Sequence, residues 1–261
     1  MPFTFAHPAA TLPLLRPLGQ YGVMSALVIG SLTPDLPYLL PLGAVHIASH
    51  TIAGVFWFCI PIGLLSYATF HILLKGPLLG LLPDFLFSRL GAYAARFQSL
   101  PPVSWASVLA SLFFGASTHL IWDSFTHQGA PAVNLFPVLQ SHLFSVGTYQ
   151  VYLFKLLQHA STSIGLLLLA LWLRQWIKTA SVNTQPLPIM LSTAHRYIAA
   201  TVIVLAPTVV GITAGMSALN QQLNTFDFQF FAGRTVFSSM PAFFLAVAAY
   251  SIGWHLWRLR G

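Results

Sequence analysis

Charged residues are scarce in this chain of 261 residues, and acidic ones are the scarcest. Only 6% of the residues are charged, glutamate does not occur, and the acids are four aspartates. With 56% hydrophobic residues and a mean hydropathy of +0.76, the composition excludes an ordinary soluble protein. It predicts an all-α fold, a polytopic bundle of membrane helices.

Basic residues are also few, although they outnumber the acids and give a formal net charge of +7. The 11 lysines and arginines are scattered between apolar runs and form no cluster in the sequence. A phosphate-binding surface is therefore not expected, and we predict no nucleic-acid partner. We interpret the basic residues as signals of orientation in the membrane.

Cysteine is nearly absent, since Cys59 is the only one. This excludes an intramolecular disulfide and a cysteine-based zinc cluster, and we expect Cys59 to be a small buried hydrophobe. The N-terminus has no basic residue before Arg16 and carries prolines at positions 2, 8 and 13. It does not resemble a cleavable signal peptide, so we expect it to remain in the mature protein.

Five long apolar runs are at or near the ~20 residues needed to cross the hydrocarbon core. They are Thr51–Leu74, Trp105–Trp122, Leu156–Leu173, Tyr197–Phe226 and Thr235–Trp257. These runs predict five transmembrane helices. We divide the chain into a helical membrane unit over residues 1–177 and a two-span extension over residues 178–261.

The segments between the runs differ in their basic residues. Lysine or arginine flanks the loops around 76–104 and 178–195 and ends the chain, whereas residues 36–50 and 127–150 contain neither. By the positive-inside rule the first set, with the C-terminus, is cytoplasmic and the second faces outward. We therefore expect a multi-pass protein of the bacterial inner (cell) membrane.

The N-terminal 33 residues permit two arrangements, because prolines and glycines interrupt their first half. One straight helix from Pro8 to Pro34 would place His7 about 40 Å from Asp35, at ~1.5 Å per residue. A helical hairpin formed by residues 8–16 and 21–33, with Arg16 near its inner tip, would bring His7 beside Asp35. We favour the hairpin.

The strongest pattern lies in residues 115–127, where His119, Asp123 and His127 follow at intervals of four inside an apolar run. On an α-helix this spacing places the three side chains on one stripe. A charged aspartate in such an apolar segment costs free energy unless a partner neutralises its charge, and a bound metal ion such as zinc does this. The plainer interpretation is a polar stripe that forms hydrogen bonds between helices.

One ion cannot use all three residues of the stripe. A tetrahedral ion with bonds of ~2.1 Å takes ligands from positions i and i+4, but positions i and i+8 lie ~12 Å apart. His119 and Asp123 are therefore the predicted pair. His127 either supports that pair or belongs to a second ion that Asp123 bridges.

Three further candidates precede the apolar run Thr51–Leu74 on the predicted outer side. His46 and His50 repeat the four-residue interval, and Asp35 follows Pro34. We interpret His50 and Asp35 as metal ligands and His46 as a weaker candidate. The plainer alternatives are an interfacial histidine and a turn or cap aspartate.

Two more candidates lie at the start of the apolar run Leu156–Leu173. His159 lies at a comparable depth and would complete a metal site, while Lys155 would hold an anionic substrate group such as phosphate. The alternative for Lys155 is a side chain that extends to the lipid headgroups. His71, His195 and His255 lie near the predicted cytoplasmic ends, away from this site.

Several of these segments carry a resemblance to a known family. They are Met-Pro-Phe-Thr-Phe-Ala-His-Pro at 1–8, Gly-Ser-Leu-Thr-Pro-Asp at 30–35, Ser-His-Thr at 49–51, Thr-His-Leu-Ile-Trp-Asp-Ser-Phe-Thr-His at 118–127 and Lys-Leu-Leu-Gln-His at 155–159. The chain resembles, over about residues 1–177, the bacterial membrane family called domain of unknown function 4184. That family is similar to membrane-bound metal-dependent hydrolases and, more distantly, to the zinc phospholipase C and P1 nuclease superfamily.

The resemblance implies a set of zinc ligands around a water that attacks a phosphoester. The implied ligands are His7, Asp35, His50, His119 and Asp123, while His127 and His159 would replace later ligands of the superfamily. Ser163 stands where the superfamily has an acidic residue. The number of ions expected is one to three.

From these patterns we expect a zinc-dependent hydrolase in the membrane, acting on a phosphoester or lipid-like substrate near the outer leaflet. Asp123 and His127 are the candidate catalytic residues, one of them accepting a proton. Membrane lipid is the expected partner. Two other classes stay open: a metal-ion carrier or sensor without chemistry, and a structural membrane protein whose histidines serve helix packing.

Overall fold

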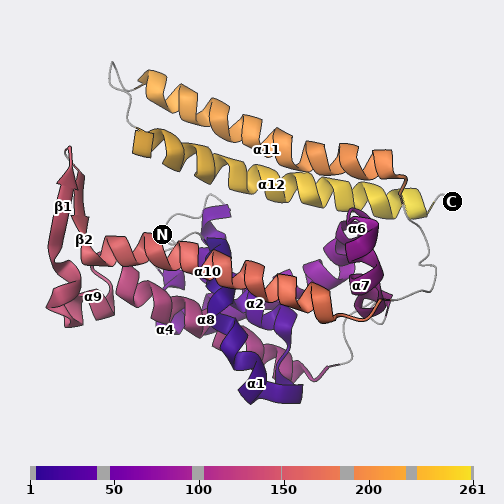
Figure 1. The fold of residues 1–261 in the computed structure, drawn as a ribbon, viewed down its shortest axis with the longest axis horizontal. Coiled ribbons are helices and arrows are strands. Elements are labelled where there is room, and N and C mark those ends of the chain that lie inside the picture. Colours follow the sequence, from indigo (N-terminus) through magenta and orange to yellow (C-terminus); the bar gives the residue numbers. More distant parts are fainter. Residues whose placement is uncertain are drawn as a thin grey trace. The chain divides into compact units, whose positions relative to one another are not determined.

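The computed structural model describes residues 4–39, 48–95, 103–147, 149–182, 191–221 and 228–259. The described chain is helical apart from one small hairpin of strands (Figure 1). It divides into two compact units. The first contains the described residues of 1–37, 42–67 and 102–179, and the second those of 38–41, 68–101 and 180–261. The two units meet along the chain at residues 179 and 180, and residues 68–101 belong to the second unit.

Among the described residues, five helices are long and apolar enough to cross a membrane, in agreement with the five predicted spans. Each covers most of its predicted run, with ends that differ by several residues. They are Ile52–Gly80, Trp105–Thr126, Leu153–Thr179, Thr193–Leu219 and Phe230–Arg258. The chain is therefore a multi-pass membrane protein.

The N-terminal segment folds back on itself, as the hairpin alternative predicted. A 3-10 helix, η1 (Thr4–Leu14), leads through α1 (Leu15–Leu18) and η2 (Gly19–Tyr21) into α2 (Met24–Leu32) and η3 (Thr33–Leu39). Gly19 supplies the reversal with a φ of 49°, a conformation that side chains disfavour. The Thr4 hydroxyl donates to Asp35 Oδ2 at 2.6 Å and joins the two ends.

Helix α8 (Trp105–Thr126) packs against α2 with the two backbones in close contact. A Cβ on Gly30 would overlap the backbone of Leu112, and one on Gly115 would overlap the carbonyl of Leu27. Small residues permit such contact in membrane helices. The contact brings the carbonyl of Ser31 within 2.7 Å of His119 Nδ1.

The span Ile52–Gly80 alternates between α-helix and π-helix. Its parts are α4 (Ile52–Gly54), η4 (Val55–Cys59), α5 (Ile60–Thr69), η5 (Phe70–Leu74) and α6 (Lys75–Gly80), of which η4 and η5 are π-helical. Thr51 caps the start, since its hydroxyl accepts from the Gly54 N–H at 2.9 Å. Cys59 is buried beside Val55 and Ala116, in accordance with the expected small hydrophobe.

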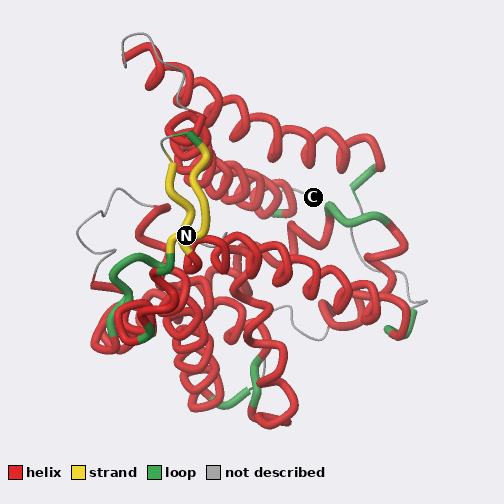
Figure 2. The backbone as a smooth tube through the Cα atoms, turned by 60° about the vertical axis from the view of Figure 1, so that its left-hand side comes forward, coloured by secondary structure: helices red, strands yellow, loops and turns green. Residues whose placement is uncertain are grey.

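Between α8 and α10 (Leu153–Thr179) the chain forms α9 (Pro131–Leu135), η6 (Pro137–Gln140) and a hairpin. Strands β1 (His142–Val146) and β2 (Tyr149–Tyr152) are antiparallel, with an irregularity between His142 and Phe144 (Figure 2). The sequence pattern predicted an outer loop here and no strands. A glycine between two runs of aromatic and β-branched residues is typical of a hairpin, and Gly147 has a φ of 60°.

In the second unit, α11 (Thr193–Gln221) and α12 (Phe228–Arg258) form the helical pair expected for the C-terminal extension. Helix α12 also contacts η5 and α6. The Arg196 guanidinium binds Asp84 at the start of α7 (Asp84–Ala95) at 2.6 Å. All residues of the candidate site lie in the first unit.

Candidate metal centre

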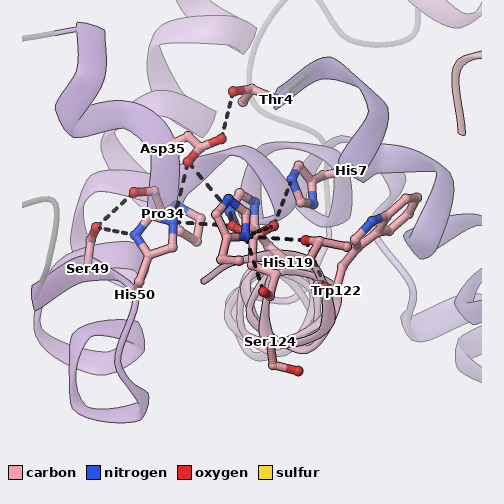
Figure 3. Close-up of polar contacts among 12 residues, drawn as sticks. Thr4, His7, Pro34, Asp35, Ser49, His50, His119, Trp122 and Ser124 are labelled. Atoms are coloured by element: carbon pink, nitrogen blue, oxygen red, sulfur yellow. Dashed lines mark hydrogen bonds and ion pairs between the residues drawn. The ribbon is translucent and has the colours of Figure 1, made fainter. Parts of the chain in front are cut away.

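Two carboxylates and three imidazoles meet inside the first unit, although four separate segments supply them (Figure 3). The segments are η1, η3, the residues just before α4, and α8. The five residues are His7, Asp35, His50, His119 and Asp123. They are the ligand set that the family resemblance implies.

Four of these side chains contribute one atom each to a closed ring. His50 Nε2 lies 3.4 Å from Asp35 Oδ1, which lies 3.6 Å from His119 Nε2. His119 Nε2 lies 3.3 Å from Asp123 Oδ2, and that oxygen lies 3.7 Å from His50 Nε2, which closes the ring. Two ligands at ~2.1 Å from a tetrahedral zinc ion are about 3.4 Å apart, close to each of these four distances. The possible ligand atoms of Asp35, His50 and His119 all lie within 4.8 Å of one another, as do those of His7, His119 and Asp123.

Neighbouring groups fix the imidazoles so that Nε2 of each is directed inward. His119 Nδ1 lies 2.7 Å from the carbonyl of Ser31, an acceptor only, so Nδ1 carries the hydrogen. The hydroxyl of Ser49 donates to the carbonyl of Pro34 at 2.8 Å and lies 3.2 Å from His50 Nδ1. It therefore accepts from His50, and Nε2 of each ring is the nitrogen left for an ion. Such outer partners are the usual support of metal-ligating histidines.

Asp35 is fixed in the same way. Thr4 donates to its Oδ2, which leaves Oδ1 for the cluster. Burial by itself raises the pKa of Asp35, but the contact with His50, the charge of His119 and the hydrogen bond from Thr4 together lower this pKa to about 2. The carboxylate is ionised at neutral pH, the form that binds a cation.

His7 approaches the other oxygen of Asp123. Its Nε2 lies 3.5 Å from Asp123 Oδ1, and its ring stacks on that of His119 with centroids 3.7 Å apart. Burial, together with the charge of His119, lowers the pKa of His7 to about 3, so the imidazole is neutral at pH 7. Asp123 thus has one oxygen in the ring of four and one beside His7, as a bridging carboxylate would.

The cluster contains several buried polar atoms that have no hydrogen-bond partner. They are both ring nitrogens of His7, Asp35 Oδ1, His119 Nε2 and Asp123 Oδ1. Each buried unsatisfied group costs about 1–3 kcal/mol, and charged ones cost more. Five such atoms around two carboxylates are poorly explained by helix packing. They fit a cation, whose charge offsets those of the two aspartates.

A family model matches residues 1–252 of the chain, and its description is a domain of unknown function, DUF4184. The chain belongs to this family. The match extends beyond the resemblance noted over residues 1–177, because it includes most of the C-terminal pair of helices. No curated protein and no solved structure matches the chain.

His127 lies beside the ring of four in this family member, at the C-terminal end of α8. Its Nδ1 lies 3.1 Å from the carbonyl of Asp123 and 3.6 Å from Asp123 Oδ1. Its Nε2 lies 3.4 Å from the side-chain nitrogen of Gln158, which is buried on α10. Because the carbonyl is an acceptor, Nδ1 carries the hydrogen and Nε2 is the basic nitrogen. Gln158, which lies beside His127, was not predicted from the sequence.

Three predicted candidates are not placed in the cluster. His159 is exposed on α10, one residue after the buried Gln158. Lys155, the predicted substrate contact, is half-buried on the first turn of α10. His46 lies outside the described residues. His71, His195 and His255 belong to the second unit, in accordance with their exclusion from the predicted site.

The side chains of the cluster differ in exposure within the described part of the chain. Those of His7, His119 and Asp35 are 0–2% exposed, whereas those of Asp123, His50 and His127 are 10%, 20% and 29% exposed. His50 precedes α4 and His127 follows α8, so the exposed opening of the cluster lies at the ends of two spans.

Proposed function

We propose that this protein is an integral-membrane metal-dependent hydrolase with zinc held by His50, His119, Asp35 and Asp123. The observation that carries the proposal is the closed ring of four atoms at 3.3–3.7 Å, the spacing of ligands around one ion. The carboxylates of the two aspartates and the inward Nε2 atoms of both histidines supply the donor set. When bound, the ion would act as a Lewis acid that polarises a scissile phosphoester and lowers the pKa of a bound water.

The arrangement around Asp123 supports a second ion position. His7 Nε2 and Asp123 Oδ1 are adjacent, buried and without hydrogen-bond partners. An ion here would share Asp123 with the first and take His7 as its own ligand. Asp123 would then hold both positions in register and align the reacting oxygens of a substrate.

His127 is the proton acceptor in this proposal. It lies directly beside Asp123, it is the most exposed residue of the group, and its basic Nε2 is the nitrogen near Gln158. Burial lowers its pKa below the ordinary value of a histidine, so the ring is neutral at pH 7 and able to take up a proton.

The position of the opening supports a substrate delivered at the membrane surface, with a phosphoester as its reacting group. Lys155 lies three residues before Gln158, on the same side of α10, so it is the proposed contact for the anionic group. By the distribution of basic residues this surface is the outer one, and the C-terminus is cytoplasmic.

The metal test uses the purified protein in lipid nanodiscs and measures zinc per chain by elemental analysis. Wild type is expected to hold at least one ion at pH 7.5, while Asp35→Asn and His119→Gln lose most of it. The matched control is His142→Gln, which replaces an exposed histidine outside the cluster. Wild type without bound metal, or equal loss in the control, contradicts the metal site.

The activity test uses bis-p-nitrophenyl phosphate and vesicles of phosphatidylglycerol. Hydrolysis is expected from the metal-loaded wild type, and a loss of about 10²–10⁴-fold from His127→Ala with its metal retained, the range for a general base. A protein that binds zinc and transports it across the membrane without cleaving either compound would instead be a metal-ion carrier.

A further inference from the structure

The segment between α8 and α10 presents apolar side chains but contains no charge. Residues 127–152 include no lysine, arginine, aspartate or glutamate. Five large apolar side chains of this segment are exposed: Leu135, Phe136, Val138, Leu143 and Phe144. Leu135 is 72% exposed and Val138 62%. A soluble surface rarely leaves such a group of side chains in water, so another environment covers it.

The hydrocarbon core is not that environment. Strands β1 and β2 form a sheet of two strands, so each has an outer edge of backbone N–H and C=O groups. Hydrocarbon cannot satisfy these groups, which is why open sheet edges do not face lipid tails. The headgroup layer meets both demands, because it offers apolar contact as well as water and polar partners.

The direction of the hairpin agrees with this location. In Figures 1 and 2 the strands run across the N-terminal end of α10 and do not continue along its axis. Because α10 is a membrane-crossing helix, a hairpin across its end lies along the membrane surface. Tyr152 and Leu153 pack with a buried cluster of Val133, Leu139 and Phe154, which fixes the segment to α10.

We propose that residues 131–152 form a lipid-binding surface that lies in the headgroup layer of the bilayer. Its occupant is membrane lipid, because the surface is uncharged and continuous with two membrane-spanning helices, α8 and α10. Exposed Phe144 and Leu143 enter the upper acyl region, while the strand edges stay hydrated. Amphipathic segments bind membranes in this manner.

The surface also defines a substrate class, and this step rests on the proposed function. His127 begins the same segment and borders the opening of the cluster. A hairpin in the headgroup layer places that opening at the level of lipid phosphates. The substrate is then a phosphoester within a lipid headgroup, which enters sideways from the bilayer.

The test measures the depth of a nitroxide on single-cysteine variants in proteoliposomes of phosphatidylethanolamine and phosphatidylglycerol. The background is Cys59→Ala, and the probes are Phe144→Cys and Leu143→Cys. Two described positions calibrate the scale: Leu167→Cys, 58% exposed in the middle of α10, and Ser181→Cys, exposed beyond its end. Collision with oxygen reports lipid, and collision with a water-soluble nickel chelate reports water.

The labels at Phe144 and Leu143 are expected to give oxygen-to-nickel ratios severalfold above that of Ser181 and below that of Leu167. A ratio equal to that of Ser181 places the hairpin in water and overturns the proposal. A ratio equal to that of Leu167 places the hairpin in hydrocarbon and also overturns the proposal. Protection from both reagents indicates a protein cover and also overturns it. The measurement needs no catalysis, so a failure of the hydrolase proposal is observed separately.

Discussion

At the scale of single residues, the partners outside the cluster decide which atoms are left for an ion. Ser31 and Ser49 direct two imidazoles inward, and Thr4 engages the outer oxygen of Asp35. Ser31 acts through its backbone carbonyl, which lies beside His119 Nδ1. Ser49 is itself oriented by the backbone carbonyl of Pro34, to which its hydroxyl donates. The ligand geometry is therefore a property of the fold and not of the ligands alone.

Gln158 and His159 provide a matched pair for testing the proton acceptor. Gln158→Leu keeps most of the side-chain volume but removes the amide near His127 Nε2, so kcat for the proposed hydrolysis is expected to fall about tenfold. Zinc content and KM are expected to stay at wild-type values. His159→Ala removes an exposed side chain and is expected to change none of the three. Equal effects of the two substitutions would show that Gln158 does not position His127.

The same pair shows why part of the site escaped prediction from sequence. The spacing of His119 and Asp123 was enough to predict two ligands, because residues four apart share a helix face. Consecutive residues differ by about 100° around a helix, and residue type favoured His159 over Gln158. The packing of α10 against η1 and α8 is needed to show that Gln158, and not His159, is directed toward the cluster. The partners of each ring nitrogen are likewise set by contacts between distant segments.

At the scale of elements, the close contact of α2 and α8 supports the cluster. Gly30→Ala would place a Cβ against the backbone of Leu112, so the helices must separate and Ser31 must move from His119. We expect a loss of about 1–3 kcal/mol in stability and a weaker affinity for zinc, measured by thermal unfolding and by competition with a chelator. Gly233→Ala is the control, since nothing lies within 4 Å of its added Cβ. Unchanged zinc affinity in Gly30→Ala would contradict this coupling.

Elements were predictable to different degrees. Long uncharged runs identified all five spans, because the bilayer requires about 20 apolar residues from each. The N-terminal hairpin was deduced from proline and glycine breaks, and the Thr4–Asp35 contact agrees with it. Strands β1 and β2 were not predicted, since a short pair of strands has a weak sequence pattern and depends on its contacts with α9 and α10 for stability.

At the scale of the whole molecule, the arrangement of charge predicts a direction across the membrane. Ser141→Cys, beside the hairpin, is expected to react with a membrane-impermeant maleimide on intact cells in the Cys59→Ala background. Ser181→Cys, after α10, is expected to react only after lysis, because the nearby basic residues predict a cytoplasmic location for that end. Both side chains are exposed in the structure. The opposite pattern of labelling would show that the protein has the reverse orientation, with the cluster at the cytoplasmic surface.

The order of the ligands along the chain has a consequence for biosynthesis. His7, Asp35 and His50 emerge from the ribosome early, but His119 and Asp123 arrive only with α8. An ion therefore cannot be enclosed until that helix has entered the membrane and packed on α2. The N-terminal hairpin carries two of the proposed ligands before α8 is made, so in the proposed function metal loading would be a late step in the assembly of the protein.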